Sequence, residues 1–317
     1  MIFYILRSVI NLKHITVKEA AKLWDISDRR VRALCYEGKI PGVIKEGRAY
    51  KIPADALKPV DERRLRGKKI STQYESLFRH IDAKKAELER RRPLTQGELE
   101  RLREEFLLEF TYNSNAIEGS TLTLQETAMV LEGITIDKKP LKEHLEAVGH
   151  RDAFEYVKAL VSEDVDLSES IIKNIHTLVL MDRPQDRGVY RRIPVRILGA
   201  KVEPPQPYMV GIKMEELMKS YNNAGNKLHG IEKIARFHLD FEEIHPFIDG
   251  NGRTGRLVLN LELMKNGYPP ISVKFTDRKK YYECFHQYTE KSDPSGMILM
   301  VSEYLEEELD KYLSILE

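Results

Sequence analysis

The residues best placed to do chemistry lie in one stretch, HPFIDGNGRTGR, which runs from His245 to Arg256. His245 is the only side chain in it that can accept a proton near neutral pH. Asp249 can hold a hard cation such as Mg²⁺, which in nucleotide sites is shared with phosphate oxygens. A base next to a metal ligand indicates a reaction at a phosphate.

Two helices must position this stretch. Apolar residues recur at helical spacing on both sides of it, at Ile234, Phe237, Phe241 and Ile244 before it and at Leu257, Leu261 and Met264 after it. The first helix should end near His245, because Pro246 disfavours the α conformation in the residue before it. The second helix should begin around Gly252. The stretch is therefore predicted to be a turn between two helices.

The start of the second helix is predicted to bind a polyphosphate. Its free backbone N–H groups and the positive end of its dipole attract an anion, and Gly250 and Gly252 let a phosphate approach the backbone without a Cβ in the way. Arg253 and Arg256 lie one turn apart on the same helical face, so both guanidinium groups can grip successive phosphates. With the base and the metal ligand, these residues predict attack by a hydroxyl group on a nucleotide phosphate.

Two other interpretations compete with this one. His-Pro and Asn-Gly are common in turns, and two arginines on a helix are often merely solvated. His238, Glu242 and His245 could instead form a zinc ligand set, although that would leave the glycines and arginines unexplained. On its own, His238 is expected to be a buried, hydrogen-bonding histidine.

HPFIDGNGR matches the signature of the Fic domain family, and GRTGRLVLN continues it; the resemblance runs from about Ile81 to the C-terminus. Members with this motif usually transfer AMP from ATP to a Ser, Thr or Tyr hydroxyl of a target protein and release pyrophosphate. The resemblance implies ATP as substrate, Mg²⁺ as cofactor, His245 as general base and Asp249 as metal ligand. It also implies a phosphate cradle at Gly250, Asn251 and Gly252, with Arg253 and Arg256 contacting the β- and γ-phosphates.

A second motif lies in TYNSNAIEGSTLT, where Ser114 and Glu118 share one helical face and Gly119 ends the helix. It resembles the inhibitory motif of Fic proteins, in the class whose inhibitory helix precedes the catalytic core. Glu118 would pair with Arg256 and so occupy the guanidinium group meant for the γ-phosphate, which predicts low basal activity. The alternative is that Glu118 is a surface or capping carboxylate. In some relatives this glutamate positions a water that removes AMP from the target, so the resemblance leaves AMP removal open here.

The segment YRRIPVRILGAKVEPPQP predicts an isolated β-hairpin, in which residues 194–198 and 201–203 flank the turn Gly199-Ala200. The resemblance implies that this hairpin is a flap that pairs with an extended segment of the target protein. Val195 and Ile197 are the side chains expected to matter. The alternative is a structural arm that clasps the helical core.

The segment DRKKYYECFHQYTE resembles the part of the family in which a tyrosine lies near the adenine base. Tyr282, ahead of Tyr281, is the candidate for this contact. Relatives often carry an Asn seven residues after that tyrosine, and here Thr289 stands in its place. This departure weakens the assignment of the adenine contact.

The N-terminal segment predicts two short helices, the second capped by Ser27, followed by a small wing around Glu46-Gly47. This outline resembles excisionase-type winged helix-turn-helix modules, which bind DNA. The side chains expected to contact DNA are Arg29, Arg30 and Arg32 on the second helix and Arg48 on the wing. Up to Gly67 there are 15 Lys/Arg against 8 Asp/Glu, which suits a polyanionic partner. The alternative is a small protein-docking module.

The chain is thus predicted to be mainly α: a Fic-type helical bundle with a β-hairpin flap, plus a small winged helix-turn-helix domain. The expected boundaries are 1–60 for the N-terminal domain, 61–80 for a linker and the start of a long helix, and 81–317 for the Fic domain, with the inhibitory helix around 105–119. Thr95 and Glu98 predict a capping box at the start of that helix.

The expected partners are ATP, a target protein and, through the N-terminal domain, DNA; a homodimer is also allowed. No apolar run approaches the roughly 20 residues of a membrane helix, so no membrane is expected. Two cysteines without paired spacing fit a reducing cytoplasm. The rival function, from another class, is a transcriptional regulator whose Fic domain senses a nucleotide.

Overall fold

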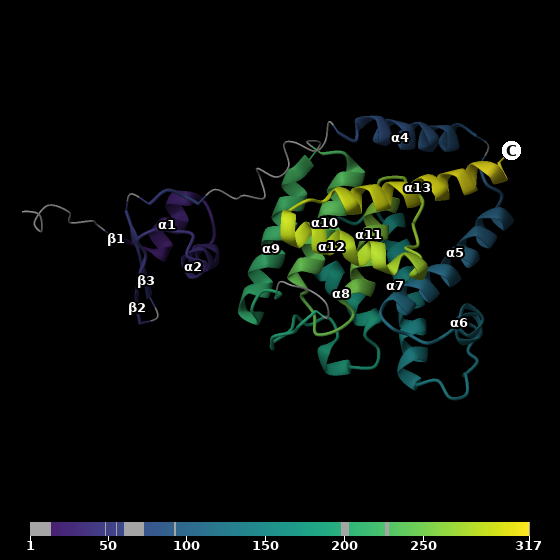
Figure 1. Ribbon diagram of the computed structural model, residues 1–317, viewed down its shortest axis with the longest axis horizontal. Helices are drawn as coiled ribbons and strands as arrows, with labels where there is room; N and C mark the ends of the chain where they lie inside the picture. The colour runs from purple at the N-terminus through teal and green to yellow at the C-terminus, as the bar shows by residue number, and fades with distance from the viewer. Residues whose placement is uncertain are drawn as a thin grey trace, which may run out of the picture. The chain divides into compact units, whose positions relative to one another are not determined.

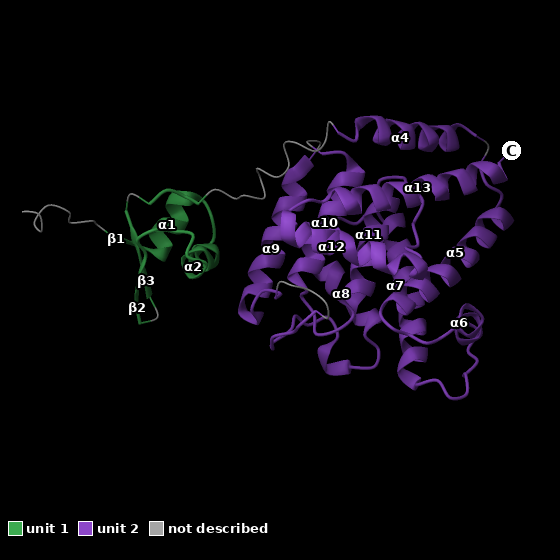
Figure 2. Cartoon of the chain, viewed as in Figure 1, with its two compact units in different colours: residues 1–66 green, residues 67–317 purple. Residues whose placement is uncertain are grey.

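The computed structural model describes residues 14–47, 49–54, 56–59, 73–91, 93–197, 203–225 and 228–316. The chain divides into two compact units, residues 1–66 and 67–317 (Figure 2). Helices make up most of the described residues, and the strands among them form one small sheet in the first unit.

The first unit is a helix-turn-helix with a wing, as predicted. Its elements are β1 (His14–Thr16), α1 (Val17–Trp24), α2 (Asp28–Tyr36), β2 (Ile44–Glu46) and β3 (Ala49–Pro53). The strands are antiparallel in the order β1-β3-β2. The Ser27 hydroxyl accepts the N–H of Arg30 at 3.2 Å, which confirms the predicted cap of α2. A small core that includes Trp24, Val31 and Ile52 joins the helices to the sheet.

The second unit is helical throughout its assigned elements (Figure 1). In chain order these are α4 (Glu75–Arg90), α5 (Gln96–Ile117), α6 (Leu124–Leu131), α7 (Leu141–Ser162), α8 (Glu169–Val179), η1 (Pro184–Asp186), α9 (Pro207–Ala224), α10 (Gly230–Ile244), α11 (Asn251–Lys265), η3 (Phe275–Asp277), α12 (Arg278–Lys291) and α13 (Ser295–Ile315). The capping box predicted for α5 is present, because Thr95 and Glu98 exchange hydrogen bonds with each other's backbone N–H.

Helices α10 and α11 lie at the centre of this unit and separate two apolar clusters (Figure 1). One cluster joins them to α4, α12 and α13, and the other joins them to α5, α7, α8 and α9. Because α11 contributes side chains to both, most of its residues are buried, including the arginines near its start. The two helices that flank the turn are therefore fixed by packing in both apolar clusters.

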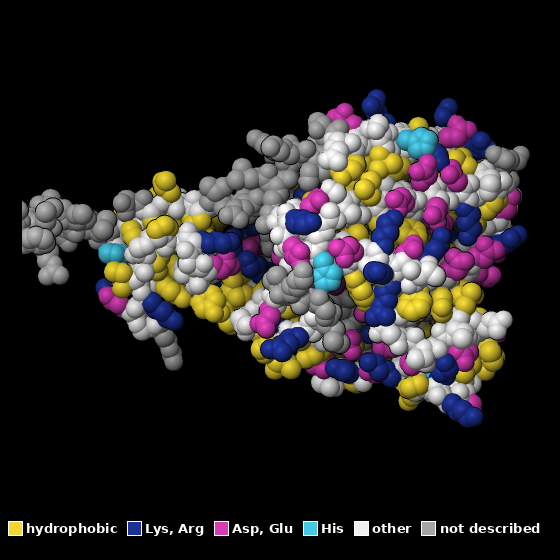
Figure 3. All heavy atoms as spheres, viewed as in Figure 1, with side chains coloured by type: hydrophobic (Ala, Val, Ile, Leu, Met, Phe, Trp, Pro, Cys, Tyr) yellow, Lys and Arg dark blue, Asp and Glu magenta, His cyan; other side chains and the backbone are white. Residues whose placement is uncertain are grey.

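Helix α4 lies along α13 (Figure 1). Phe78 and Ile81 are buried in the cluster there, and Lys84 pairs with Glu306 and Asp310 at 2.9 and 2.7 Å. On the face drawn in Figure 3, acidic and basic side chains are interspersed over this region. No helix in the described part of the chain is long and apolar enough to cross a bilayer.

The predicted hairpin is not formed in the part of it that the structure describes. Residues 194–197 and 203–206 have no strand assignment, and the Gly199-Ala200 turn lies outside the described residues. The two arms do approach each other, since Arg196 Nε lies 3.7 Å from Glu203 Oε1. Strand pairing fails because Pro194, Pro204 and Pro205 supply no N–H groups to a ladder. The prediction of two strands here was wrong for these residues.

Candidate active site

The turn between α10 and α11 is fixed by its own backbone and by Asn251. His245 ends α10 in the left-handed conformation at φ 49°, and Gly250 precedes α11 with φ 75°. Asn251, at the start of α11, accepts the N–H of Phe247 at 2.8 Å and donates to its carbonyl at 2.9 Å. These contacts confirm the predicted turn between two helices. They also commit the Asn251 side chain to the loop, so only its backbone can take part in the expected phosphate cradle.

His176 on α8 holds the turn from outside. Its Nε2 donates to the carbonyl of Asp249 at 3.0 Å, and its Nδ1 accepts the N–H of Gly188 at 2.9 Å. Burial lowers the pKa of His176 to about 4, so the ring is neutral, as one donor and one acceptor require. Its ring also stacks on Phe247, with 3.7 Å between ring centroids. Sequence analysis missed His176, although its helical spacing from Ile172 in an apolar helix was an available signal.

His245, the expected general base, lies at the edge of the turn. Its side chain is 22% exposed, so a hydroxyl group can reach it. Burial is the main cause that lowers the pKa of His245 to about 4, against the opposing effect of Glu118. Its Nδ1 lies 3.8 Å from Glu242, a largely buried glutamate whose pKa burial raises to about 8.

Arg256 is buried and binds the end of α5. Its Nε donates to the Ser114 hydroxyl at 2.9 Å, and its Nη2 donates to the Ser114 carbonyl and to Glu118 Oε1, both at 2.8 Å. Its Nη1 donates to the Tyr281 hydroxyl at 3.4 Å. The guanidinium side chain is only 2% exposed, whereas that of Glu118 is 34% exposed. The motif residues Ser114 and Glu118 therefore meet Arg256 across 142 and 138 positions of sequence.

The carboxylate of Glu118 also lies against Gly252, in the first turn of α11. A Cβ added to Gly252 would come within 2.1 Å of Glu118 Oε1 and 3.1 Å of Arg256 Nη1. The space that the glycine opens at the start of α11 is thus filled by a negatively charged group from α5. Gly119 follows with φ 103°, which agrees with the predicted end of the helix.

Asp249 lies among cations. Lys142 and Arg183 approach its carboxylate at 3.6 and 3.8 Å, and Arg253 at 3.5 Å. Burial opposes its ionisation, but these cations, Arg253 foremost, hold the pKa of Asp249 below its ordinary value. Arg253 itself is buried and pairs with Glu146 of α7 at 3.0 Å. A partly exposed, ionised carboxylate beside the first turn of α11 fits a Mg²⁺ ion that takes its other ligands from phosphates and water.

The zinc alternative was wrong. No three His, Cys, Asp or Glu residues gather to hold a metal ion within the described ranges. His238 is buried, and its Nε2 lies 2.7 Å from the Tyr281 hydroxyl. It is therefore the buried, hydrogen-bonding histidine that was expected.

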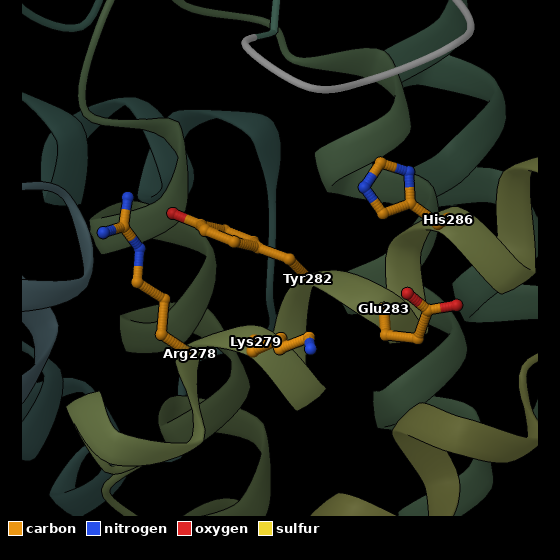
Figure 4. Close-up of a pocket in the computed structure, with 5 residues that line it drawn as sticks. All are labelled: Arg278, Lys279, Tyr282, Glu283 and His286. Carbon is orange, nitrogen blue, oxygen red and sulfur yellow. The ribbon is translucent and has the colours of Figure 1, made fainter.

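Tyr282 lines an open pocket on α12, together with Arg278, Lys279, Glu283 and His286 (Figure 4). The pocket has a volume of about 360 Å³. The phenol of Tyr282 extends toward the side of Arg278 and away from His286 (Figure 4). Its hydroxyl donates to the carbonyl of Ile117 at 3.2 Å, one residue before Glu118. Tyr281 is buried, and its hydroxyl accepts a hydrogen bond from Arg256. Tyr282 is partly exposed, so it is the better placed of the two to contact an adenine ring.

Val195 and Ile197 are partly exposed, in a segment that begins beside the turn. The N–H of Arg191 donates to the carbonyl of Pro246 at 2.9 Å, and its Nε donates to the carbonyl of His245 at 2.8 Å. The sequence did not predict a role for Arg191, because its partners are backbone carbonyls, which every residue has, and not acidic side chains that a sequence pattern could reveal.

The expected DNA contacts lie on α2. Arg29 and Arg32 are exposed, and Arg30 is partly buried. Arg48 lies outside the described residues.

Comparison with known families gives two matches. The sequence profile of the Fic/DOC family matches residues 166–263, and that of a helix-turn-helix domain matches residues 15–58. Proteins named Protein adenylyltransferase Fic, from Drosophila melanogaster and Drosophila sechellia, are 34% identical over 264 residues, which is 82% of this chain and 50% of theirs. The chain thus spans about half the length of these curated relatives.

Solved structures agree with the sequence matches. A Fic domain containing signaling protein from Bacteroides thetaiotaomicron is 30% identical, with a TM-score of 0.65 over 76% of this chain and 95% of that chain. A fragment of Fic-1 from C. elegans is 28% identical, with a TM-score of 0.70 over 78% of this chain and 74% of that chain.

Proposed function

The chain belongs to the Fic/DOC family, and from this premise we propose that it is a protein adenylyltransferase, which transfers AMP from ATP to a Ser, Thr or Tyr hydroxyl of a target protein. One observation carries the proposal: a neutral, reachable His245 stands at the same turn as a helix start opened by Gly252 and flanked by buried Arg253 and Arg256. The names of the adenylyltransferase relatives support it.

The proposed reaction assigns each group one task. The triphosphate lies over the backbone of residues 250–252, with Arg253 and Arg256 binding its outer phosphates. His245 takes the proton of the target hydroxyl, whose oxygen attacks the α-phosphorus. The bond from that phosphorus to the bridging oxygen breaks, and pyrophosphate leaves with the bond's electrons. Asp249 would hold Mg²⁺, which when bound neutralises charge on the phosphates.

Autoinhibition is part of the proposal. Glu118 occupies Arg256 and the space over Gly252, where the outermost phosphate would have to lie. ATP can then bind productively only if the carboxylate moves aside. Removal of AMP through a water held by Glu118 is a separate hypothesis, which a chase of labelled target with unlabelled ATP tests.

The test of the transferase uses ATP labelled in its α-phosphate, Mg²⁺ and a cell lysate. Label should appear on protein, more strongly with Glu118→Gly, and none should appear with His245→Ala. Mass spectrometry should find the mass of AMP on hydroxyl side chains. Equal labelling by the unmodified chain, Glu118→Gly and His245→Ala would refute the proposal. An added mass different from that of AMP would show that another group is transferred.

DNA binding by the first unit is a second proposed function, supported by the helix-turn-helix match and by exposed Arg29 and Arg32 on α2. A gel shift with DNA upstream of the protein's own gene, at stated salt, should show a complex that Arg29→Ala and Arg32→Ala weaken. Lys219→Ala, which changes an exposed cation of α9, is the matched control. Binding that is independent of sequence would leave the regulator hypothesis without support.

We also place the protein in the cytoplasm. Both cysteines, Cys35 and Cys284, are buried and unpaired, which suits a reducing compartment.

A further inference from the structure

Arg191 is buried, and its side chain donates hydrogen bonds to four backbone carbonyls. Nε donates to His245 O at 2.8 Å, and Nη2 donates to Pro205 O at 2.5 Å and to Ile244 O at 3.4 Å. Nη1 donates to Ile193 O at 3.4 Å. Only 4% of the residue is exposed. A buried cation of this kind needs all of these acceptors to offset the loss of its hydration.

These acceptors have different origins. Ile244 and His245 end helix α10, where the negative end of the dipole favours a cation. Ile193 and Pro205 lie on the two sides of the segment whose residues Val195 and Ile197 are the expected target contacts. The hydrogen bonds of the Arg191 guanidinium in the described part of the chain all go to backbone carbonyls.

We propose that Arg191 is a positioning residue, which holds both ends of the target-docking segment at a fixed place relative to His245. The inference rests on the proposed function, because it takes His245 as the base. It takes residues 193–197 and 203–205 as the two described arms of the docking segment. The new content is a mechanical link: one side chain ties the backbone of the base to the backbone of the segment against which the target protein is expected to dock.

The planar fork of arginine is what makes this link. Five N–H groups in fixed directions can reach carbonyls on both sides of the docking segment and on α10 at once. A lysine at the same position keeps the charge but carries its three donors on one nitrogen. It can therefore reach either the carbonyls at the end of α10 or those of the docking segment, but not both. Arg191→Lys therefore separates the link from the charge.

The experiment compares Arg191→Lys with Arg192→Lys, its exposed neighbour, both in the Glu118→Gly background. Hydrogen exchange measured by mass spectrometry reports the link directly, and labelling of lysate proteins with Mg²⁺-ATP reports its consequence. Calorimetric titration with Mg²⁺-ATP reports whether the nucleotide site is intact.

Arg191→Lys should exchange faster at the amide of residue 191, whose N–H donates to the carbonyl of Pro246. It should also label at least about tenfold more slowly, because small displacements of reacting groups are costly. Its affinity for Mg²⁺-ATP should stay within about twofold of the background protein, since the arginine contacts no proposed phosphate ligand. Arg192→Lys should change none of the three.

If hydrogen exchange in Arg191→Lys equals that of the background protein, the proposed link between His245 and the docking segment is overturned, whether or not either protein labels a target. Faster exchange with undiminished labelling would overturn its role in the reaction. If Arg191→Lys loses both its affinity for Mg²⁺-ATP and its labelling activity, Arg191 supports the fold of the whole site, and the proposed positioning role is overturned. If the Glu118→Gly background itself labels nothing, the transferase proposal fails and the role in that reaction fails with it, while the exchange result still decides the link.

Discussion

Replacing Glu118 should raise the rate of AMP transfer by an amount that its contact with Arg256 sets. The bond between Arg256 Nη2 and Glu118 Oε1 is 2.8 Å long and joins two charged groups. Hydrogen bonds of this type contribute about 1.5–3 kcal/mol. Because Glu118 is 34% exposed, solvent screens the interaction, so we take the lower end of that range. Displacing the carboxylate should thus cost the productive ATP complex about 1.5 kcal/mol.

A difference of about 1.4 kcal/mol is tenfold in an equilibrium. Glu118→Gly should therefore increase the rate of label transfer about tenfold at Mg²⁺-ATP concentrations well below saturation, where the cost of displacing the carboxylate limits productive binding. Glu118→Gln keeps the shape and a hydrogen bond from the Arg256 guanidinium to a neutral amide oxygen. At about 1 kcal/mol for that bond the gain is about 0.5 kcal/mol, so the increase should be smaller, about twofold. The ranking of the two variants is as informative as their magnitudes, because it follows from the charge of one oxygen atom.

Glu132→Gln is the matched control, since Glu132 is an exposed glutamate at the end of α6 and lies outside the site. Its rate should equal that of the unmodified chain. The reasoning fails if Glu118→Gly is no faster than the control. It also fails if Glu118→Gln matches Glu118→Gly, because the brake would then depend on shape and not on charge.

Three further predictions concern the turn. The rate of labelling by the Glu118→Gly variant should show no inflection near pH 6.5, because the pKa of His245 is lowered to about 4 and the loss of the nearby carboxylate lowers it further. A pH profile of the labelling rate checks this, with circular dichroism at each pH to show that the protein stays folded. A midpoint near pH 6.5 would contradict it. Asn251→Ala should lower the free energy of unfolding by about 2–4 kcal/mol, because it leaves a buried N–H and carbonyl unpaired. Urea unfolding measures it against the exposed Asn223→Ala. Gly252→Ala should abolish labelling even without the inhibitory glutamate, since its Cβ fills the space the phosphate needs, whereas Gly97→Ala, with open space around it, should not.

The sequence was sufficient for those parts of the fold and site that depend on neighbouring residues. Pro246 after a run of helical apolar positions predicted where α10 ends, and the apolar spacing from Leu257 predicted a second helix from around Gly252, which begins at Asn251. Ser27 and Thr95 predicted helix starts through their own side chains. Each of these signals lies within one short stretch of the chain, so a single sequence contains all of it.

The sequence was insufficient where distant side chains bind the backbone. His176 and Arg191 meet the turn through carbonyl oxygens, which every residue carries, so no pattern of residue types predicts the contact. Glu146 pairs with Arg253 across 107 positions, and several other glutamates were equally available to it. The strands predicted in the hairpin are absent from residues 194–197 and 203 for another reason: the alternation of residue types does not register that Pro194, Pro204 and Pro205 supply no N–H groups for strand pairing.

The contacts of Arg256 indicate how little must move for the site to become competent. Two of its hydrogen bonds go to the hydroxyl and carbonyl of Ser114, deep in the last turn of α5, and neither depends on Glu118. Those bonds keep the guanidinium group in place when the carboxylate leaves, so its orientation toward Gly252 is preorganised. Glu118 itself follows the last residue of α5 and is partly exposed, so its side chain can swing into solvent while the helix stays packed. Under the proposed autoinhibition, the inhibited and competent states can therefore differ by one side-chain rotation. A ligand then has to supply only the free energy of one screened ion pair to bring it about.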